Sequence, residues 1–109
     1  YAFFMRNKYG AIKTKYNGVM YASKLEARCA AYLDVLKKAG EITAINRQVA
    51  FVLLPKPNLV KYVADFLVYL PDGTKKVVEA KGIWTSTAKL KNKMFKHFYP
   101  DIKLEIYTK

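Results

Sequence analysis

Apolar positions along the chain recur with two spacings, one typical of helices and the other typical of strands. Between Lys24 and Ala39 they recur every three or four residues, which predicts an amphipathic helix. The sequence Ser-x-x-Glu from Ser23 to Glu26 has the form of a capping box at the start of that helix. Gly40 follows two lysines, as is typical of a helix end. We therefore expect a helix from about Lys24 to Ala39.

Three runs with the composition of strands follow this helix. They cover about Ile45 to Leu54, Lys61 to Leu70 and Lys75 to Ile83. The turn sequence Pro71-Asp72-Gly73 separates the second run from the third, and it predicts that these two strands pair antiparallel.

A second helix and a last strand complete the pattern. Thr85 or Ser86 can cap the helix, which ends before Pro100. Its apolar residues on one side are Leu90, Met94 and Phe98. Apolar and polar residues then alternate from Ile102 onward, which predicts a half-buried strand. The order α-β-β-β-α-β predicts a single α/β domain, a central mixed sheet flanked by helices, after a basic N-terminal segment over residues 1–22.

The charge of the chain is strongly unbalanced, with a formal net charge of +12. Like charges repel in a compact chain, so this excess indicates a polyanionic partner, and nucleic acid is favoured. The lysines that we expect to contact phosphates are Lys13, Lys15, Lys24, Lys89, Lys91 and Lys93. An anionic membrane is the weaker alternative, because no stretch pairs its lysines with a clean apolar face. A third possibility is that the protein is basic but has no polyanionic partner.

Cysteine and histidine are each used once. Cys29 lies within the first predicted helix, where burial is the simplest role. A lone cysteine forms neither an intrachain disulfide nor a zinc cluster, which fits a protein of the cytoplasm. His97 alone cannot form a multi-histidine site. No apolar run approaches the roughly 20 residues that span a bilayer, so we expect no membrane insertion.

Two acidic residues interrupt the apolar strands. Asp65 lies in a run that is otherwise apolar on both faces, and burying a bare carboxylate costs several kcal/mol. Glu79 and Lys81 are two residues apart in a strand and therefore share a face. If the turn at Pro71 to Gly73 pairs the strands, Asp65 lies beside Glu79. This predicts a site of two carboxylates and an ammonium group. The alternative for Glu79 and Lys81 is a solvated salt bridge.

Such a site suits the hydrolysis of a phosphodiester. Hard cations prefer carboxylate and carbonyl oxygens, so Asp65 and Glu79, with the Ala80 carbonyl, would hold Mg²⁺ or Mn²⁺. The ion lowers the pKa of a water and offsets charge in the transition state. Lys81 would orient that water or stabilise the developing negative charge.

Three further residues each have two interpretations. Glu26 either closes the capping box or borders the face of the helix that packs on the sheet, within reach of the site. Gln48 either points toward the site from the first strand or is an ordinary polar residue of a strand edge. Trp84 either stacks on a base or packs in the core or an interface. The residues alone leave these alternatives open.

Together these residues resemble the PD-(D/E)XK nuclease superfamily. Within it, they are similar to the bacteriophage endonuclease I Holliday-junction resolvases and to related small phage proteins. The matching stretches are Ser23 to Glu26, Tyr62 to Leu67 and Val78 to Trp84. Tyr99 to Ile102 and the lysine-rich second helix extend the likeness over about residues 18–108.

The resemblance implies a restriction-endonuclease-like fold and a Mg²⁺-dependent endonuclease for DNA, with no organic cofactor. Its substrate would include branched DNA in phage recombination or replication, in the cytoplasm of the bacterial host. Asp65 and Glu79 would be metal-binding acids, Lys81 the catalytic lysine and Glu26 the helix glutamate that completes the catalytic and metal-binding set. Ala64 stands where the family usually has proline.

The resemblance also implies a homodimer, because resolvases of this kind act as dimers. Two alternatives remain. One is a basic DNA-binding module without catalysis on the same fold, and the other is a nuclease subunit that cuts only within a recombination or transposition complex.

Overall fold

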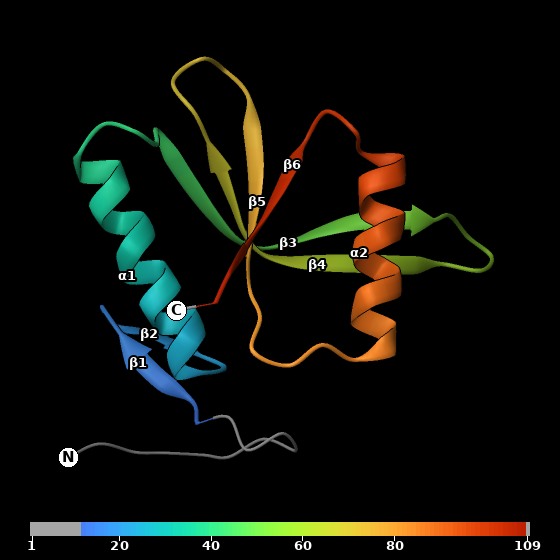
Figure 1. Cartoon of the computed structure of the whole chain (residues 1–109), viewed down its shortest axis with the longest axis horizontal. Helices are drawn as coiled ribbons and strands as arrows, with labels where there is room; N and C mark the ends of the chain where they lie inside the picture. Colours follow the sequence, from blue (N-terminus) through green and yellow to red (C-terminus); the bar gives the residue numbers. More distant parts are fainter. Residues whose placement is uncertain (1–11, 109) are drawn as a thin grey trace.

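A four-stranded sheet with a helix on either side forms the centre of the computed structural model, which describes residues 12–108 (Figure 1). The elements, in chain order, are β1 (Thr14–Tyr16), β2 (Val19–Tyr21), α1 (Lys24–Lys38), β3 (Ala44–Leu54), β4 (Val60–Tyr69), β5 (Lys75–Ala80), α2 (Ser86–Phe98) and β6 (Lys103–Tyr107). Within the described part of the chain, no helix is both long and apolar enough to cross a membrane.

The sheet has the order β3-β4-β5-β6 and is mixed. β3, β4 and β5 pair antiparallel, whereas β6 lies parallel to β5. A parallel neighbour requires a crossover connection, and α2 provides it. The turn between β4 and β5 uses a positive φ at Gly73 and a hydrogen bond from the Thr74 amide to the Asp72 carboxylate. The predicted α/β class, the element order from Lys24 onward and this antiparallel pairing are confirmed.

The first helix begins and ends close to the predicted residues. The Ser23 hydroxyl accepts a hydrogen bond from the amide of Glu26 at 3.0 Å, and the positive φ of Gly40 follows the last turn. Its buried side consists of small and apolar residues, which pack on one face of the sheet. These are Ala27, Cys29, Ala30 and Leu33, with Phe66, Val68 and Val78 opposite them. The expected burial of Cys29 is confirmed.

The second helix packs on the opposite face, and of the three apolar residues predicted on one side only Met94 packs against the core. Phe95 is fully buried against Leu67 and Val77, whereas Leu90 and Phe98 are 57% and 47% exposed. The inward stripe runs from Ala88 through Lys91 and Asn92 to Phe95 and Tyr99. Because Lys91 and Asn92 are polar, the spacing of apolar residues does not reveal this stripe. These two polar residues face an open pocket beside the sheet rather than the core.

The strands differ from the prediction in two ways. The strand expected from Lys75 to Ile83 ends at Ala80, because the chain then leaves the sheet and exposes Ile83 and Trp84. The N-terminal part of the chain adds a hairpin, β1–β2, whose turn has positive φ at both Asn17 and Gly18. Residues 1–11 of the predicted basic segment lie outside the described residues.

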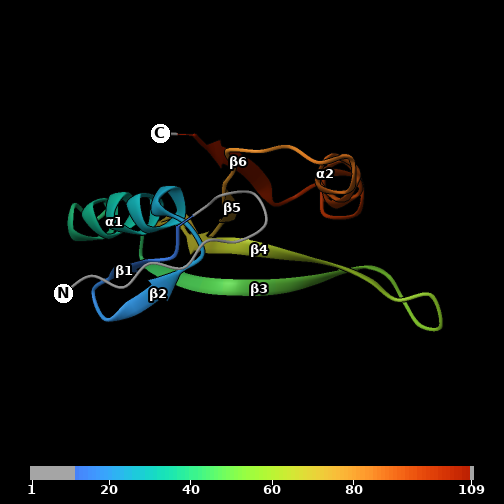
Figure 2. The ribbon, with the colours of Figure 1, turned by 90° about the horizontal axis from the view of Figure 1, so that it is seen from below.

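The hairpin β1–β2 is fixed to α1. The Tyr16 hydroxyl donates a hydrogen bond to Asp34 at 2.9 Å, and Tyr21 is buried in the core between α1 and the sheet. Figure 2 shows this hairpin next to α1, while the far end of the β3–β4 ribbon projects beyond α2 on the other side.

Candidate active site

Asp65 and Glu79 lie opposite one another where β4 and β5 stop pairing. The last regular pair between these strands is Phe66 with Val78, and Asp65 and Glu79 are the next residues beyond this pair. There the carboxylates replace backbone carbonyls as acceptors. The Asp65 amide donates to Glu79 Oε1 at 2.9 Å, and the Ala80 amide donates to Asp65 Oδ2 at 3.0 Å. The two carboxylates are thereby held side by side at the point where the strands separate.

Gln48 lies opposite Asp65 on the other neighbouring strand. The β3–β4 ladder skips this position, with Arg47 paired to Phe66 on one side and Val49 paired to Ala64 on the other. Gln48 has a φ of 52°, in the left-handed region that residues other than glycine rarely adopt. Hydrogen bonding by its side chain lowers the pKa of Asp65. Of its two interpretations, the structure therefore supports proximity to the site.

Lys81 shares the face of Glu79, as their spacing predicts. Its Nζ lies 4.0 Å from Glu79 Oε2. Glu79 is only 5% exposed, so this pair is not the solvated salt bridge that was the alternative. The Lys81 side chain is less buried than that of Glu79, and Lys81 lines an open pocket. It can therefore contact both the buried acid and a molecule in that pocket.

Ionisation of Asp65 and Glu79 at the same time is unfavourable. Burial is the main cause that raises the pKa of Glu79 to about 7, and the nearby charge of Asp65 adds to it. Burial also raises the pKa of Asp65, against the hydrogen bond from Ala80 and the charge of Lys81. A cation bound between these carboxylates would favour the ionised form of both.

Glu26 approaches the same region from the first turn of α1. It is 6% exposed, and burial raises its pKa to about 7, with a further contribution from the charge of Asp65. Its backbone amide is used in the helix cap, while its Oε2 lies 3.6 Å from Arg47 Nη2. The Arg47 guanidinium in turn lies 4.3 Å from the centre of the Tyr21 ring. The carboxylate is therefore directed toward the sheet, so capping alone does not account for this glutamate.

The donor set suits one hard cation with water in its remaining positions. Within residues 12–108, no three acidic, cysteine or histidine side chains are grouped closely enough to ligate an ion together. Asp65 and Glu79 form an adjacent pair, and Mg²⁺ is often bound through one or two carboxylates while it keeps several waters. These two residues, with the Ala80 carbonyl, are the candidate ligands. Glu26 is close enough to influence Asp65 but is held by Arg47.

An open pocket of about 280 Å³ joins Glu79 to the start of α2. Glu79 and Lys81 line one side of it, and Trp84, Thr85 and Lys91 line another. Trp84 is 37% exposed, so it is not a core residue.

The lysines predicted to contact phosphates are spread over three elements. Lys91 alone among them lines the pocket next to Glu79 and Lys81. Lys89 and Lys93 are exposed elsewhere on α2, and Lys24 is exposed at the start of α1. Lys15 is exposed on β1, and Lys13 is half-buried just before that strand.

Arg47 and Tyr62 are two residues of the site that the sequence did not indicate. Arg47 reaches Glu26 from β3, and Tyr62 lines the pocket from β4. An arginine beside Gln48 in a strand otherwise rich in apolar residues was a usable signal. Tyr62 gave none, because a tyrosine in a strand ordinarily indicates packing.

The described chain is thus an α/β domain in which two carboxylates and a lysine meet at the edge of a basic pocket. It belongs to the family described as "Protein of unknown function (DUF1064)", whose model matches residues 6–109. No curated protein matches the sequence.

Proposed function

We propose that the protein is a metal-dependent nuclease that hydrolyses phosphodiester bonds in DNA. The observation that carries this proposal is the pair formed by the half-buried Asp65 and the buried Glu79, with Lys81 4.0 Å from Glu79 at the edge of an open pocket. Two adjacent carboxylates with raised pKa values, one of them buried, favour a bound cation, and a net charge of +12 favours a polyanionic partner. A phosphodiester with a bound divalent ion fits both.

Each acid keeps one oxygen beyond its hydrogen bond to the backbone. Asp65 Oδ1 and Glu79 Oε2, with the Ala80 carbonyl, would hold Mg²⁺ or Mn²⁺. The ion supplies Lewis acidity and lowers the pKa of a water. The backbone hydrogen bonds fix both carboxylates before substrate arrives, and such preorganisation favours catalysis. Glu26 adds negative charge on the helix side of Asp65.

Lys81 has the position expected of a group that acts on the phosphate. It lines the pocket while its neighbour Glu79 is buried. It would stabilise negative charge as it develops on the phosphate oxygens or orient the attacking water. The likeness to PD-(D/E)XK nucleases supports these roles, and the likeness to junction resolvases favours branched DNA and a homodimer. The buried free thiol of Cys29 fits the reducing cytoplasm.

Cleavage of supercoiled plasmid and of a four-way junction tests the proposal. We expect nicked and linear products with Mg²⁺ or Mn²⁺, and none after a chelator is added. Asp65→Asn, Glu79→Gln and Lys81→Ala should each lower the rate by about a hundredfold or more, as loss of a charge-stabilising group typically does. Asp101→Asn, at an exposed acid outside the site, is the matched control and should cleave normally. Cleavage that survives chelation or Asp65→Asn would contradict the mechanism.

A second candidate function is DNA binding without catalysis. It is favoured by one observation, that no three potential ligands are grouped together within the described residues. This candidate predicts binding that weakens steeply with salt and yields no metal-dependent products. Nicks that accumulate with the wild type but not with Glu79→Gln exclude it.

A further inference from the structure

The hydroxyl group of Tyr62 is buried and makes no hydrogen bond of regular geometry in the part of the chain that the structure describes, while the nearby Glu79 carboxylate helps raise its pKa. Tyr62 lies on β4 and is 5% exposed, and its ring packs against Phe51 and Phe95 at centroid distances of 6.4 Å and 5.2 Å. Burying a hydroxyl without a hydrogen bond lowers the stability of the folded state. A phenylalanine ring at this position would pack equally well without that cost. The hydroxyl is therefore available to donate to a polar ligand that enters the pocket.

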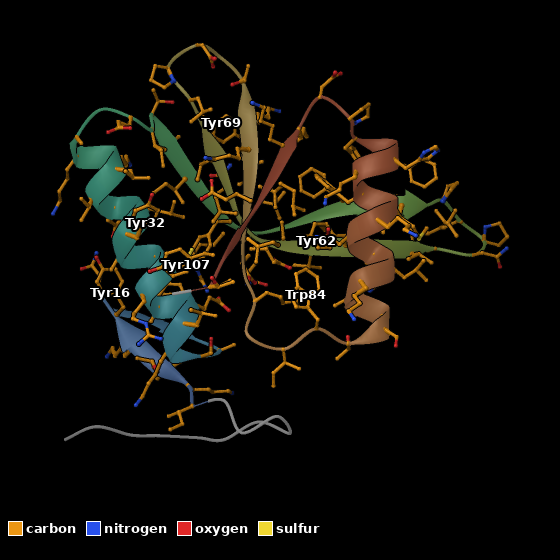
Figure 3. The ribbon with its side chains drawn as sticks, viewed as in Figure 1. Tyr16, Tyr32, Tyr62, Tyr69, Trp84 and Tyr107 are labelled. Carbon is orange, nitrogen blue, oxygen red and sulfur yellow. The ribbon has the colours of Figure 1, made fainter. Side chains whose placement is uncertain are left out.

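Tyr62 borders the pocket that joins Glu79 to α2. Figure 3 shows Tyr62 and Trp84 near one another beside the first turns of this helix, and both residues line the same pocket. Lys91, one turn further along α2, lines it as well. An unpaired donor, a cation and an exposed indole are thus gathered in one pocket.

The start of α2 also faces this pocket. Thr85, Thr87 and Ala88 line it, and the first turn of this 13-residue helix contains no acidic residue. The first amides of a helix have no acceptor within the helix and carry a partial positive charge. Helix starts of this kind bind phosphate groups. Thr85 uses its hydroxyl to accept from the Ala88 amide, which leaves earlier amides of the turn for a ligand.

We propose that this pocket is a nucleotide subsite, in which Tyr62, Lys91 and the start of α2 bind one phosphate of the substrate and Trp84 stacks on the base of the same nucleotide. The inference rests on the proposed nuclease function and deepens it. Glu79 and Lys81 line the same pocket, so a strand held there would pass next to Glu79 and Lys81. The subsite thus selects nucleic acid over other phosphate esters, because it needs both a phosphate and an aromatic base.

Trp84 makes the subsite directly observable, because it is the single tryptophan of the chain. Thymidine monophosphate is titrated into the full chain in the presence of a chelator, and the tryptophan fluorescence is followed. We expect saturable quenching by the nucleotide. Thymidine and inorganic phosphate should each bind at least about tenfold more weakly, because each lacks one of the two contacts. Equal binding of inorganic phosphate, or no quenching by the nucleotide, overturns the subsite.

An oligothymidylate distinguishes a strand from a free nucleotide. We expect it to bind at least as tightly as the mononucleotide, because additional phosphates contact the basic surface. Binding of the mononucleotide without binding of the oligomer would instead identify a pocket for free nucleotides and contradict the proposal.

Variants of the two phosphate contacts provide the sharper test. Lys91→Ala and Tyr62→Phe should each weaken nucleotide binding by about tenfold, as expected when a hydrogen bond to a charged group is lost. Lys96→Ala removes an exposed lysine of the same helix outside the pocket and should change binding by less than about twofold. An equal loss in Lys96→Ala would mean diffuse charge attraction and overturn the proposal.

Tyr62→Phe carries its own control for folding. It keeps the ring that packs on Phe51 and Phe95 and removes only the unpaired oxygen. We therefore expect a melting temperature at or above that of the wild type, together with weaker nucleotide binding. A lower melting temperature would show that the hydroxyl is satisfied within the fold, and the proposal would fail.

Failure of the subsite and failure of the nuclease function give different results. Nucleotide quenching without any metal-dependent cleavage would leave the subsite and remove the nuclease proposal. Metal-dependent cleavage without quenching would leave the nuclease proposal and remove the subsite.

Discussion

The Asp65 amide donates a hydrogen bond to the Glu79 carboxylate, and the Asp65 carboxylate accepts one from the amide that follows Glu79. The bonds run in both directions across the gap where β4 and β5 stop pairing. Each acid is therefore positioned by the backbone of the other strand. This arrangement places the half-buried Asp65 carboxylate beside the buried Glu79 carboxylate, and the repulsion between the two charges has several measurable consequences.

Glu79→Gln should stabilise the metal-free protein. Glutamine retains an oxygen for the Asp65 amide but removes one of the two like charges. We expect the free energy of unfolding above neutral pH, in chelator, to rise by about 1 kcal/mol. Denaturant unfolding measures this, and Glu41→Gln, at an exposed acid, should change it by less than about 0.5 kcal/mol. A loss of stability in Glu79→Gln would contradict the repulsion between the acids.

Stability should also fall as the pH rises through a defined window. The pKa values of Glu26 and Glu79 are about 7, against 4.5 for an ordinary glutamate. Between these values the folded chain binds more protons than the unfolded chain, so its stability is greatest at the acidic end and is lost by about pH 7. The expected loss is on the order of 1 kcal/mol per group.

Urea unfolding across this window, in chelator, measures the effect. Glu26→Gln should reduce the slope, because it removes one of the two groups. Stability that increases with pH between 4.5 and 7 would mean that these glutamates are not buried as described.

Arg47 is expected to be a positioning residue for Glu26. Its guanidinium lies 3.6 Å from Glu26 and 4.3 Å from the centre of the Tyr21 ring. Arg47→Met should lower the free energy of unfolding by about 1 kcal/mol, because a largely buried acid loses its cation while Arg47 itself is partly exposed. The loss should be smaller at pH 4.5, where Glu26 is protonated.

Arg28→Met, at an exposed arginine of α1, is the matched control and should leave stability within about 0.5 kcal/mol of the wild type. Equal effects at both arginines, or no pH dependence of the Arg47 effect, would count against the pairing with Glu26.

Gln48→Gly should separate stability from activity. Glycine adopts a positive φ without strain, so we expect stability to rise by up to about 1 kcal/mol. The same change removes the amide that acts on Asp65, so cleavage should become slower. Ala50→Gly, two residues further along β3, is the control and should destabilise by about 0.5–1 kcal/mol, because that position has no positive φ. Destabilisation by Gln48→Gly would contradict the strain.

Local pattern was sufficient to predict most of the fold. Helix α1 follows from its spacing and its Ser23 cap, and the β4–β5 pairing follows from the turn at Gly73. For helix α2 the apolar pattern marked Met94 but missed most of the inward stripe, because Lys91 and Asn92 lie in that stripe beside an open pocket. A stripe that borders an open pocket needs no apolar residues, so periodicity alone could not find it.

The candidate site could be predicted only in part. The proximity of Asp65, Glu79 and Lys81 follows from strand geometry once the turn is known. The position of Glu26 depends on how α1 packs across the sheet. The role of Arg47 depends on this packing and on the position of Glu26. The exchange of hydrogen bonds between the acids and the backbone depends on where the ladder ends, which no local pattern encodes.

Plasmid cleavage by the wild type and by Asp65→Asn, each with Mg²⁺ and with chelator, tests the central claim most directly. The variant keeps an oxygen for the Ala80 amide but loses the charge that would hold the ion. We predict that the wild type cleaves with Mg²⁺ alone and that Asp65→Asn cleaves under neither condition. Equal cleavage by the two proteins with Mg²⁺, or cleavage by the wild type in chelator, would contradict a metal-dependent nuclease built on Asp65 and Glu79.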